Sequence, residues 1–287
     1  MDEQHFHNRS ADASRVAQRT TSQAGTQSEL EAVVFDAGGT LVRLDYEWMS
    51  EVLAQLGVRA SAADLRRTEV HGRRRYDAAA GKAPNTPAMG IHPPIGSVGP
   101  SRAYFSGMLE AAGCRHPLLE EALERLRERQ TPPSFLWDRP MEGAREALDA
   151  LTAQGVRCCC ISNSDGRAEM HLVKHGVRDG LEFVVDSQIE GVEKPDPRIF
   201  GIALARLALA DRPERTVYVG DIRSVDEAGS RGAGMHFVLV DPFGDYAAEG
   251  QLAVRRLDEL PALLASRFQL VNSRGSTSQP PSRSAPS

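Results

Sequence analysis

Short runs of apolar residues alternate with longer amphipathic segments along this chain. The runs lie at 32–35, 156–161, 183–185, 216–219 and 237–240, and each has the length of one buried β-strand. The segment 143–154 instead repeats its apolar residues at helical spacing. Strands that alternate with helices are typical of a parallel sheet covered by helices on both faces. We therefore expect an α/β fold with a doubly wound parallel sheet.

Between the first strand and residue 143 the pattern is helical throughout. The apolar positions of 46–56 recur at helical spacing and stop before Gly57, a residue type common at helix C-termini. Ser61 and Asp64 have the spacing of a capping box that begins another helix. The segments 101–112 and 117–130 are amphipathic as well. These four segments predict a helical insertion.

The composition of the chain divides it into regions. Residues 1–29 and 272–287 are rich in polar residues and have few apolar ones, so we expect disordered tails. Residues 30–45 and 136–271 are expected to form the α/β core, and residues 46–135 the helical domain. Within that domain the Pro/Gly-rich stretch 82–101 is expected to be a lid or disordered.

Charge and composition exclude several classes of protein. A net charge of −5 argues against a nucleic-acid binder, whose surface would be basic. The longest apolar runs are far shorter than the ~20 residues of a membrane span. The beginning, MDEQHFHNRS, lacks the apolar region of a secretion signal. The 4 cysteines, three of them adjacent (158–160), suit neither a disulfide framework nor a zinc site and are expected to be buried. We expect a cytoplasmic protein, either a monomer or a homodimer.

Polar motifs follow the predicted strands. They are Asp36-Ala-Gly-Gly-Thr-Leu41, Ser162-Asn163, Lys194-Pro-Asp-Pro-Arg-Ile-Phe200 and Gly220-Asp221 with Asp226. The carboxyl ends of parallel strands lie at one edge of the sheet, where such folds bind ligands. A nucleophilic carboxylate, a hydroxyl, a cation and a pair of acids suit a phosphoryl group beside a divalent metal.

In this order and spacing the four motifs resemble those of haloacid dehalogenase (HAD) superfamily hydrolases, in the branch with a helical cap between the first and second motifs. The likeness is densest in VEKPDPRIF (192–200) and VYVGDIRSVDEAGSRGAG (217–234). It implies a Rossmann-like core, an α-helical cap and a Mg²⁺-dependent phosphatase. The implied substrate is a small phosphorylated metabolite, a phosphoric monoester or an acyl phosphate.

The resemblance also implies roles for single residues. Asp36 would be the nucleophile that forms an aspartyl-phosphate. Mg²⁺ would be held by Asp36, the backbone carbonyl of Gly38 and Asp221. Asp226 would hold a metal-bound water or serve as a further ligand.

The phosphate would be bound by a second set of groups. Ser162 Oγ and the amide of Asn163 would bond its oxygens, and the loop residues Gly39 and Thr40 would lie against it. Lys194, one of only 3 lysines in the chain, would offset the charge that develops during transfer.

One position departs from the family's pattern. Phosphatases of this superfamily usually carry an aspartate, the general acid, where this chain has Gly38. General acid–base catalysis contributes about 10²–10⁴-fold, so alkyl phosphates should react slowly. Three explanations stay open. Asp45 or Glu47 could supply the proton, the leaving group could be good enough to need none, or the protein could sense phosphorylated ligands or bind a partner.

Two other branches of the superfamily also lack this aspartate. Haloacid dehalogenases work without metal and would not need the acids Asp221 and Asp226. Phosphonatases use a cap lysine, for which Lys82 is the only candidate in the insertion, and its surroundings resemble a surface turn. Both branches are less consistent with the sequence than a phosphatase.

Two clusters of charged or metal-ligating residues need an interpretation. Five arginines (66, 67, 73, 74 and 75) lie on one predicted helix and are expected to form mainly a solvated face, with one or two able to reach the cleft. His171 and His175 stand one helical turn apart, as zinc ligands do, but no third ligand pattern accompanies them. We expect these histidines on a helix surface or at the edge of the core.

Overall fold

The computed structural model of the protein describes residues 27–81 and 99–272. Within these residues a six-stranded parallel sheet has the strand order β6–β5–β2–β7–β8–β9. Its strands are β2 (Ala32–Phe35), β5 (Arg157–Ser162), β6 (Val184–Asp186), β7 (Thr216–Gly220), β8 (His236–Val240) and β9 (Ala253–Val254). All five predicted strands are present, so the expected α/β fold is confirmed.

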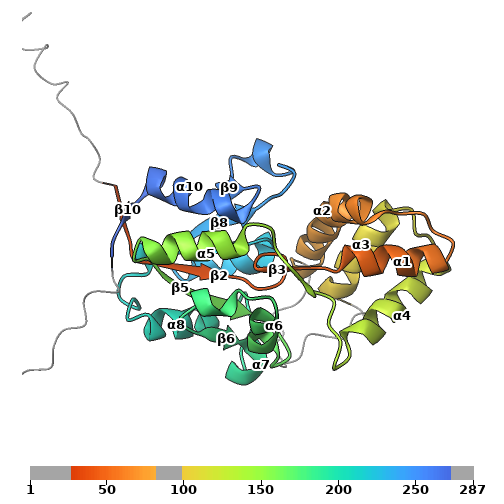
Figure 1. Ribbon diagram of the computed structural model, residues 1–287, viewed down its shortest axis with the longest axis horizontal. Coiled ribbons are helices and arrows are strands. Elements are labelled where there is room, and N and C mark those ends of the chain that lie inside the picture. Colours follow the sequence, from red (N-terminus) through yellow and green to blue (C-terminus); the bar gives the residue numbers. More distant parts are fainter. Residues whose placement is uncertain (1–26, 82–98, 273–287) are drawn as a thin grey trace, which may run out of the picture.

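Helices cover both faces of this sheet (Figure 1). On one face Val33 and Phe35 pack with the apolar side chains of α5 (Ala144–Ala153) and α10 (Leu260–Arg267). On the other face Val34 and Tyr218 pack with α8 (Pro197–Arg206). The central strands are therefore buried on both sides, which is why their sequences are continuous apolar runs without alternation.

Four helices lie at one end of the sheet (Figure 1) and form their own apolar cluster. They are α1 (Tyr46–Gln55), α2 (Ala62–Ala80), α3 (Pro100–Ala111) and α4 (Leu118–Gln130), and we call them the cap. The chain leaves the core through β3 (Val42–Arg43) and returns through β4 (Arg139–Pro140), which pair antiparallel. This agrees with the expected helical insertion.

The remaining elements are short. They comprise α6 (Ala168–Lys174), α7 (Ser187–Glu190), α9 (Ala228–Gly232) and the helical turns η1 (Arg178–Gly180), η2 (Pro213–Arg215), η3 (Arg223–Glu227), η4 (Ala247–Glu249) and η5 (Leu257–Glu259). A parallel pair, β1 (Glu29–Leu30) with β10 (Gln269–Leu270), joins the two ends of the described core. Glu29 therefore belongs to the folded core and not to the expected tail.

Local predictions can be compared with these elements. Ser61 and Asp64 form the predicted capping box of α2. The adjacent cysteines 158–160 are buried in β5 with free thiols, as expected. The expected tails lie almost entirely outside the described residues, as do Lys82 and most of the expected lid.

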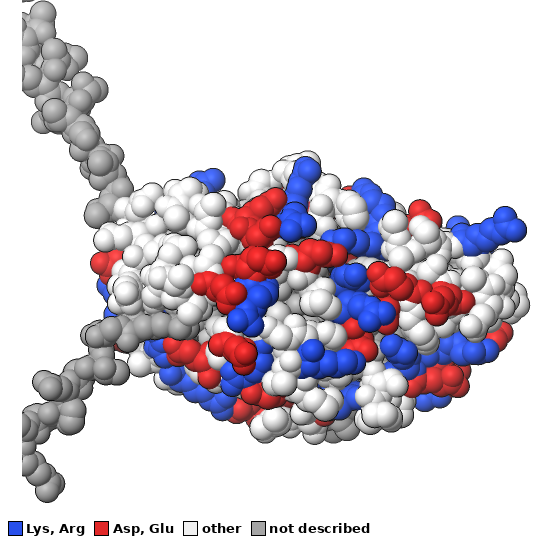
Figure 2. Space-filling view, viewed as in Figure 1, with Lys and Arg blue, Asp and Glu red and all other residues white. Residues whose placement is uncertain are grey.

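Basic and acidic side chains are intermixed over the face in Figure 2. Ion pairs between basic and acidic side chains are numerous among the described residues, for example Arg145 with Asp149 and Arg157 with Glu182. This face therefore carries no continuous basic surface. Among the helices of the described residues, none is both long and apolar enough to cross a membrane.

Candidate active site

The predicted motifs meet at the point in the sheet where the chain, after building strands on one side of β2, continues on the other side. Strand β2 lies between β5 and β7, which the chain reaches on opposite sides. Asp36 follows β2, Ser162 ends β5 and Asp221 follows β7. Because all three strands run parallel, these residues lie at one edge of the sheet, where open α/β sheets bind ligands.

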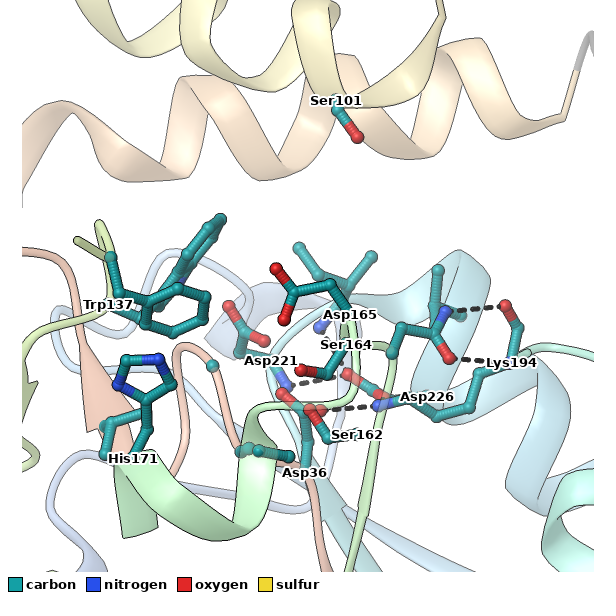
Figure 3. Close-up of a pocket in the computed structure, with 18 of the residues that line it drawn as sticks. Asp36, Ser101, Trp137, Ser162, Ser164, Asp165, His171, Lys194, Asp221 and Asp226 are labelled. Atoms are coloured by element: carbon teal, nitrogen blue, oxygen red, sulfur yellow. Dashed lines mark hydrogen bonds and ion pairs between the residues drawn. The ribbon is translucent and has the colours of Figure 1, made fainter. Parts of the chain in front are cut away.

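Lys194 joins two carboxylates at this edge. Its Nζ donates to Asp36 Oδ1 at 2.5 Å and to Asp226 Oδ1 at 2.8 Å (Figure 3). It also donates to the Tyr218 hydroxyl at 2.9 Å. Burial lowers the pKa of Lys194, but the negative charges of Asp226 and Asp36 raise it by more than burial lowers it. The pKa of Lys194 is therefore above its ordinary value, and the ammonium stays charged. The predicted cation therefore lies directly beside the predicted nucleophile.

Asp226 is held by donors on both carboxylate oxygens. Its Oδ2 accepts from the backbone N–H groups of Asp221 at 3.1 Å and Ile222 at 3.0 Å, and its Oδ1 accepts from Lys194 and from the Tyr218 hydroxyl. The π-helical turn η3 brings Asp226 back over the end of β7. This carboxylate is thus well placed to orient its neighbours, which sequence reasoning had only partly anticipated.

The acids of the site fit a divalent cation. Asp36, Asp221 and Asp226 each offer a carboxylate oxygen, and these three atoms lie within 4.8 Å of one another. Asp221 Oδ1 is buried and has no hydrogen-bond partner among the described residues. Burial raises the pKa of Asp36 to about 7 and that of Asp221 well above its ordinary value. Oxygen ligands of this kind, crowded and incompletely paired, suit Mg²⁺.

The loop after β2 has little room for a side chain at Gly38 and none at Gly39. Gly39 has φ +84°, and a Cβ there would lie 2.6 Å from the Asp221 carboxyl carbon. A Cβ on Gly38 would lie 3.2 Å from both Cδ1 and Nε1 of Trp137. Glycine at 39 is thus required by conformation and contact, and at 38 the indole of Trp137 occupies the space that a side chain would need.

A cavity of about 300 Å³ lies between this edge and the cap. Of the predicted site residues it is lined by Asp36, Gly38, Ser162, Asn163, Lys194, Asp221 and Asp226. Gly39 and Thr40 are not among the lining residues. Thr40 is fully buried, and its hydroxyl has no hydrogen-bond partner among the described residues.

The side chain of Asn163 bonds to the backbone of Lys194. Its Nδ2 donates to the Lys194 carbonyl at 2.9 Å, and its Oδ1 accepts from the Lys194 N–H at 2.8 Å. The side-chain amide therefore fixes the backbone that carries Lys194. The backbone N–H of Asn163 and the second N–H of its Nδ2 are left as donors for a phosphate.

The two acids considered as proton donors lie elsewhere. Asp45 caps α1 by accepting from the Trp48 N–H at 3.2 Å, and it pairs with Arg129 and Arg139. Glu47 pairs with Arg43 at the surface. Neither residue lines the cavity. Because helix capping and ion pairing hold both carboxylates away from Asp36, the suggestion that they supply the proton is wrong.

One arginine of the predicted cluster departs from the solvated face. Arg66 and Arg67 pair with Glu142 and Asp245, and Arg75 with Glu110. Arg73 is instead buried, with its Nε 3.2 Å from Asp221 Oδ2. Sequence patterning could not distinguish it from its neighbours, because only the docking of α2 on the core selects one position.

His171 is a further residue that sequence reasoning missed. It is only 3 % exposed, lines the cavity and stacks on Phe135. His175 pairs with Asp138 instead and does not approach the cavity. A usable signal was present, because His171 shares the inward face of α6 with Ala168 and Leu172.

Comparison with known proteins agrees with this geometry. The chain is 39% identical over 106 residues to haloacid dehalogenase-like hydrolase domain-containing protein 3 of Mus musculus, which covers 37% of this chain and 41% of the relative. It is 32% identical over 131 residues to glyceraldehyde 3-phosphate phosphatase of Methanothermobacter thermautotrophicus, covering 44% of this chain and 57% of that enzyme. The alignments thus span about half the length of these curated relatives.

The fold also matches solved structures. The magnesium-bound structure of YfnB from Bacillus subtilis aligns with a TM-score of 0.52 and 17% identity, covering 83% of this chain and 100% of that one. At this identity the likeness concerns the fold. The family model described as haloacid dehalogenase-like hydrolase matches residues 30–234, most of the chain. The chain therefore belongs to the haloacid dehalogenase-like hydrolase family, as its four motifs indicated.

Proposed function

We propose that the protein is a Mg²⁺-dependent phosphatase that acts on a small phosphorylated metabolite through an aspartyl-phosphate on Asp36. The observation that carries this proposal is the position of Asp36. Its carboxylate lies in a cluster of three acids, is bonded to Lys194 and lines a cavity that the cap encloses. The cavity of about 300 Å³ suits a small substrate.

Each residue of the site has a task in this reaction. An Asp36 oxygen attacks phosphorus, the bond from phosphorus to the leaving oxygen breaks, and water later releases phosphate from Asp36. Ser162 Oγ and the backbone N–H of Asn163 bind the phosphate oxygens, with the backbone of Gly39 and Thr40 behind them. Lys194 offsets the negative charge that grows on the oxygens.

Asp36, the Gly38 carbonyl and Asp221 would hold Mg²⁺. Asp226 would support them by orienting Asp221 or by holding a metal-bound water. When bound, Mg²⁺ supplies positive charge that stabilises the phosphoryl group and orients it toward Asp36.

The cap would separate the reaction from bulk water. Helix α2 reaches the core through Arg73 at Asp221 and through Asp77, whose Oδ1 accepts from the Ser224 N–H at 2.9 Å. Both contacts lie next to the proposed metal site, so closing the cap and completing the site are coupled. The proposal places the enzyme in the cytoplasm, where thiols such as its 4 free cysteines stay reduced.

Phosphate release tests the proposal. Phenyl phosphate, an alkyl phosphate and acetyl phosphate are incubated with and without Mg²⁺. We expect Mg²⁺-dependent release that Asp36→Asn abolishes. Asp211→Asn, at an exposed position with 81% side-chain exposure, is the matched control and should keep full activity. No release from any of the three compounds would refute the proposal.

A second candidate is a sensor that binds phosphorylated ligands with little turnover, which Gly38 favours because the usual general acid is missing. A sensor would bind beryllofluoride or a ligand without a burst of phosphate.

The metal-free dehalogenase reaction is tested by chloride release from 2-chloropropionate in the presence of a chelator. The buried acid cluster at Asp221 makes this outcome the less expected one.

A further inference from the structure

The cavity has two chemically different ends. Asp36, Lys194 and Asp221 form the charged end. Trp137 and His171 lie on the side of the cavity away from Lys194 (Figure 3). Together with Phe105 and Phe135, which also line the cavity, they form what we call the aromatic wall. Phe105 and Trp137 meet edge to face with ring centroids 5.8 Å apart, and Phe135 lies 5.9 Å from Trp137. Because aromatic rings attract one another in such arrangements, this wall suits a flat ring.

His171 adds hydrogen-bonding capacity to the aromatic wall. Its ring stacks on Phe135 with centroids 3.8 Å apart and an interplanar angle of 18°. Both ring nitrogens are buried, and neither has a hydrogen-bond partner among the described residues. Buried polar atoms are nearly always paired, so an unpaired imidazole in a cavity wall indicates a ligand atom. Burial and the nearby Arg167 lower the pKa of His171 to about 4, so the neutral ring offers one donor and one acceptor.

Trp137 links the aromatic wall to the missing acid. A Cβ placed on Gly38 would lie 3.2 Å from the indole of Trp137, so a side chain there would meet an aromatic ring. A leaving group that approaches Asp36 from this side meets a ring where the usual acid would stand, and the Asp165 carboxylate, which also lines the cavity, is paired with Arg167. A phenolate can depart without a proton, because phenols ionise with pKa about 10, as tyrosine does. An alkoxide is far more basic and needs the acid that this site lacks.

We propose that the aromatic wall selects phosphate monoesters whose leaving group is a phenol bearing a hydrogen-bonding substituent, which His171 binds. This inference rests on the proposed phosphatase function and names its substrate class. In the first step Asp36 attacks phosphorus, the P–O(aryl) bond breaks and its electron pair stays on the aryl oxygen. The phenolate takes a proton from solvent, and water then cleaves the aspartyl-phosphate to phosphate and the free carboxylate.

Matched substrates separate ring recognition from leaving-group chemistry. Phenyl phosphate is compared with cyclohexyl phosphate, which is not flat, with benzyl phosphate, which has a ring but an alkoxide leaving group, and with acetyl phosphate, which has no ring. We expect kcat/KM for phenyl phosphate to exceed that for cyclohexyl phosphate and for benzyl phosphate at least tenfold. Benzyl phosphate should have the same KM as phenyl phosphate but a lower kcat. Equal kcat/KM for phenyl and cyclohexyl phosphate would overturn the proposal.

Variants at position 171 test the hydrogen bond. The hydroxyphenyl phosphates (3- and 4-substituted) are compared with their methyl analogues, which have similar leaving-group pKa values. We expect the wild-type protein to have a kcat/KM about tenfold higher for one hydroxyphenyl phosphate than for its methyl analogue. His171→Phe should lose that preference, and His171→Gln should keep part of it. The readout is the ratio of kcat/KM for the paired compounds within each variant, which a general loss of folded protein does not change. Met170→Leu, at an exposed neighbouring position, is the control. A preference that survives His171→Phe would overturn the role of His171.

Binding gives a readout that does not need turnover. In a Trp48→Phe background Trp137 is the only tryptophan, and Asp36→Asn keeps esters intact. We expect phenyl phosphate to quench the fluorescence of Trp137 and to bind at least tenfold more tightly than cyclohexyl phosphate. If no compound releases phosphate but this difference is found, the phosphatase function fails and the aromatic subsite stands. Equal affinities in this titration would refute the subsite itself.

Discussion

Arg73 of the cap lies 3.2 Å from Asp221 Oδ2 of the core, and both side chains are buried. The same guanidinium donates to the Val240 carbonyl at 3.0 Å and pairs with Glu69 at 3.3 Å. Glu69 in turn accepts from the hydroxyl groups of Tyr46 and Tyr104. A buried polar network therefore runs from the proposed metal site into the centre of the cap, and Arg73 is its only cation among these contacts.

Removing Arg73 should strongly destabilise the protein. Arg73→Met leaves Asp221 and Glu69 buried without this cation, which typically costs about 3–5 kcal/mol. Arg73→Lys should recover little, because one ammonium cannot reach two carboxylates and a carbonyl with the geometry of a guanidinium. Urea unfolding measures both effects. Arg75→Met is the control, because Arg75 forms a surface pair with Glu110 that contributes no more than about 1 kcal/mol. Equal losses at 73 and 75 would contradict the network.

Asp221 and Asp226 should respond differently to Mg²⁺. Mg²⁺ at about 100 times its Kd should stabilise the wild-type protein by about 2.7 kcal/mol. Asp221→Asn should abolish this gain. Asp226→Asn should mainly lower stability without metal, by about 2–4 kcal/mol, because an amide nitrogen replaces one of the two accepting oxygens and the negative charge beside Lys194 is lost. Thermal unfolding with and without Mg²⁺ distinguishes the two, and identical behaviour would show that both are direct ligands.

The close contact at Gly38 should be measurable as coupling to Trp137. Gly38→Ala should destabilise the protein by about 1–3 kcal/mol, because the new methyl group overpacks against the indole. In a Trp137→Leu background this loss should shrink, so a double-mutant cycle should show a non-zero interaction energy. Gly201→Ala is the matched control. No atom lies within 4 Å of a Cβ there and the site is within α8, so stability should rise by up to about 1 kcal/mol. Additive effects of the 38 and 137 substitutions would refute the contact.

His171 should make stability depend on pH below neutrality. Its pKa is about 4 in the folded protein and about 6.5 when unfolded, so between these values the unfolded state binds more protons. Stability should therefore fall as pH is lowered through this window, and His171 should account for about 1–2 kcal/mol of the loss between pH 7 and pH 5. The loss should be smaller in His171→Phe, as measured by urea unfolding at both pH values. An unchanged loss would mean that the ring is accessible to protons when folded.

The strands and the main motifs could be predicted because local properties determine them. Buried parallel strands require continuous apolar runs, and each such run became a strand within one or two residues of its expected bounds. The polar residue after each strand could then be placed at one edge of the sheet. This is how Asp36, Ser162 and Asp221 were found without any contact being known.

The shortest strands, and the side chains that bond to other residues of the site, could not be predicted from the sequence. The pair β1–β10 joins residues about 240 positions apart, and each strand is too short for any periodicity to show. Asn163 and Asp226 were predicted to serve the ligand, and in the structure their side chains also hold Lys194 and the backbone after β7. A motif shows which groups are near, and it does not show which of them bond to one another.

The sequence by itself determined the α/β core, the helical insertion and the residues that line the charged end of the site, because apolar periodicity and residue type are properties of single segments. Only the tertiary structure decided which of five arginines is buried, that His171 faces the cavity and that Trp137 lies beside Gly38. Each of these depends on how the cap and the core pack against each other. Packing is a relation between distant segments, and no single segment encodes it.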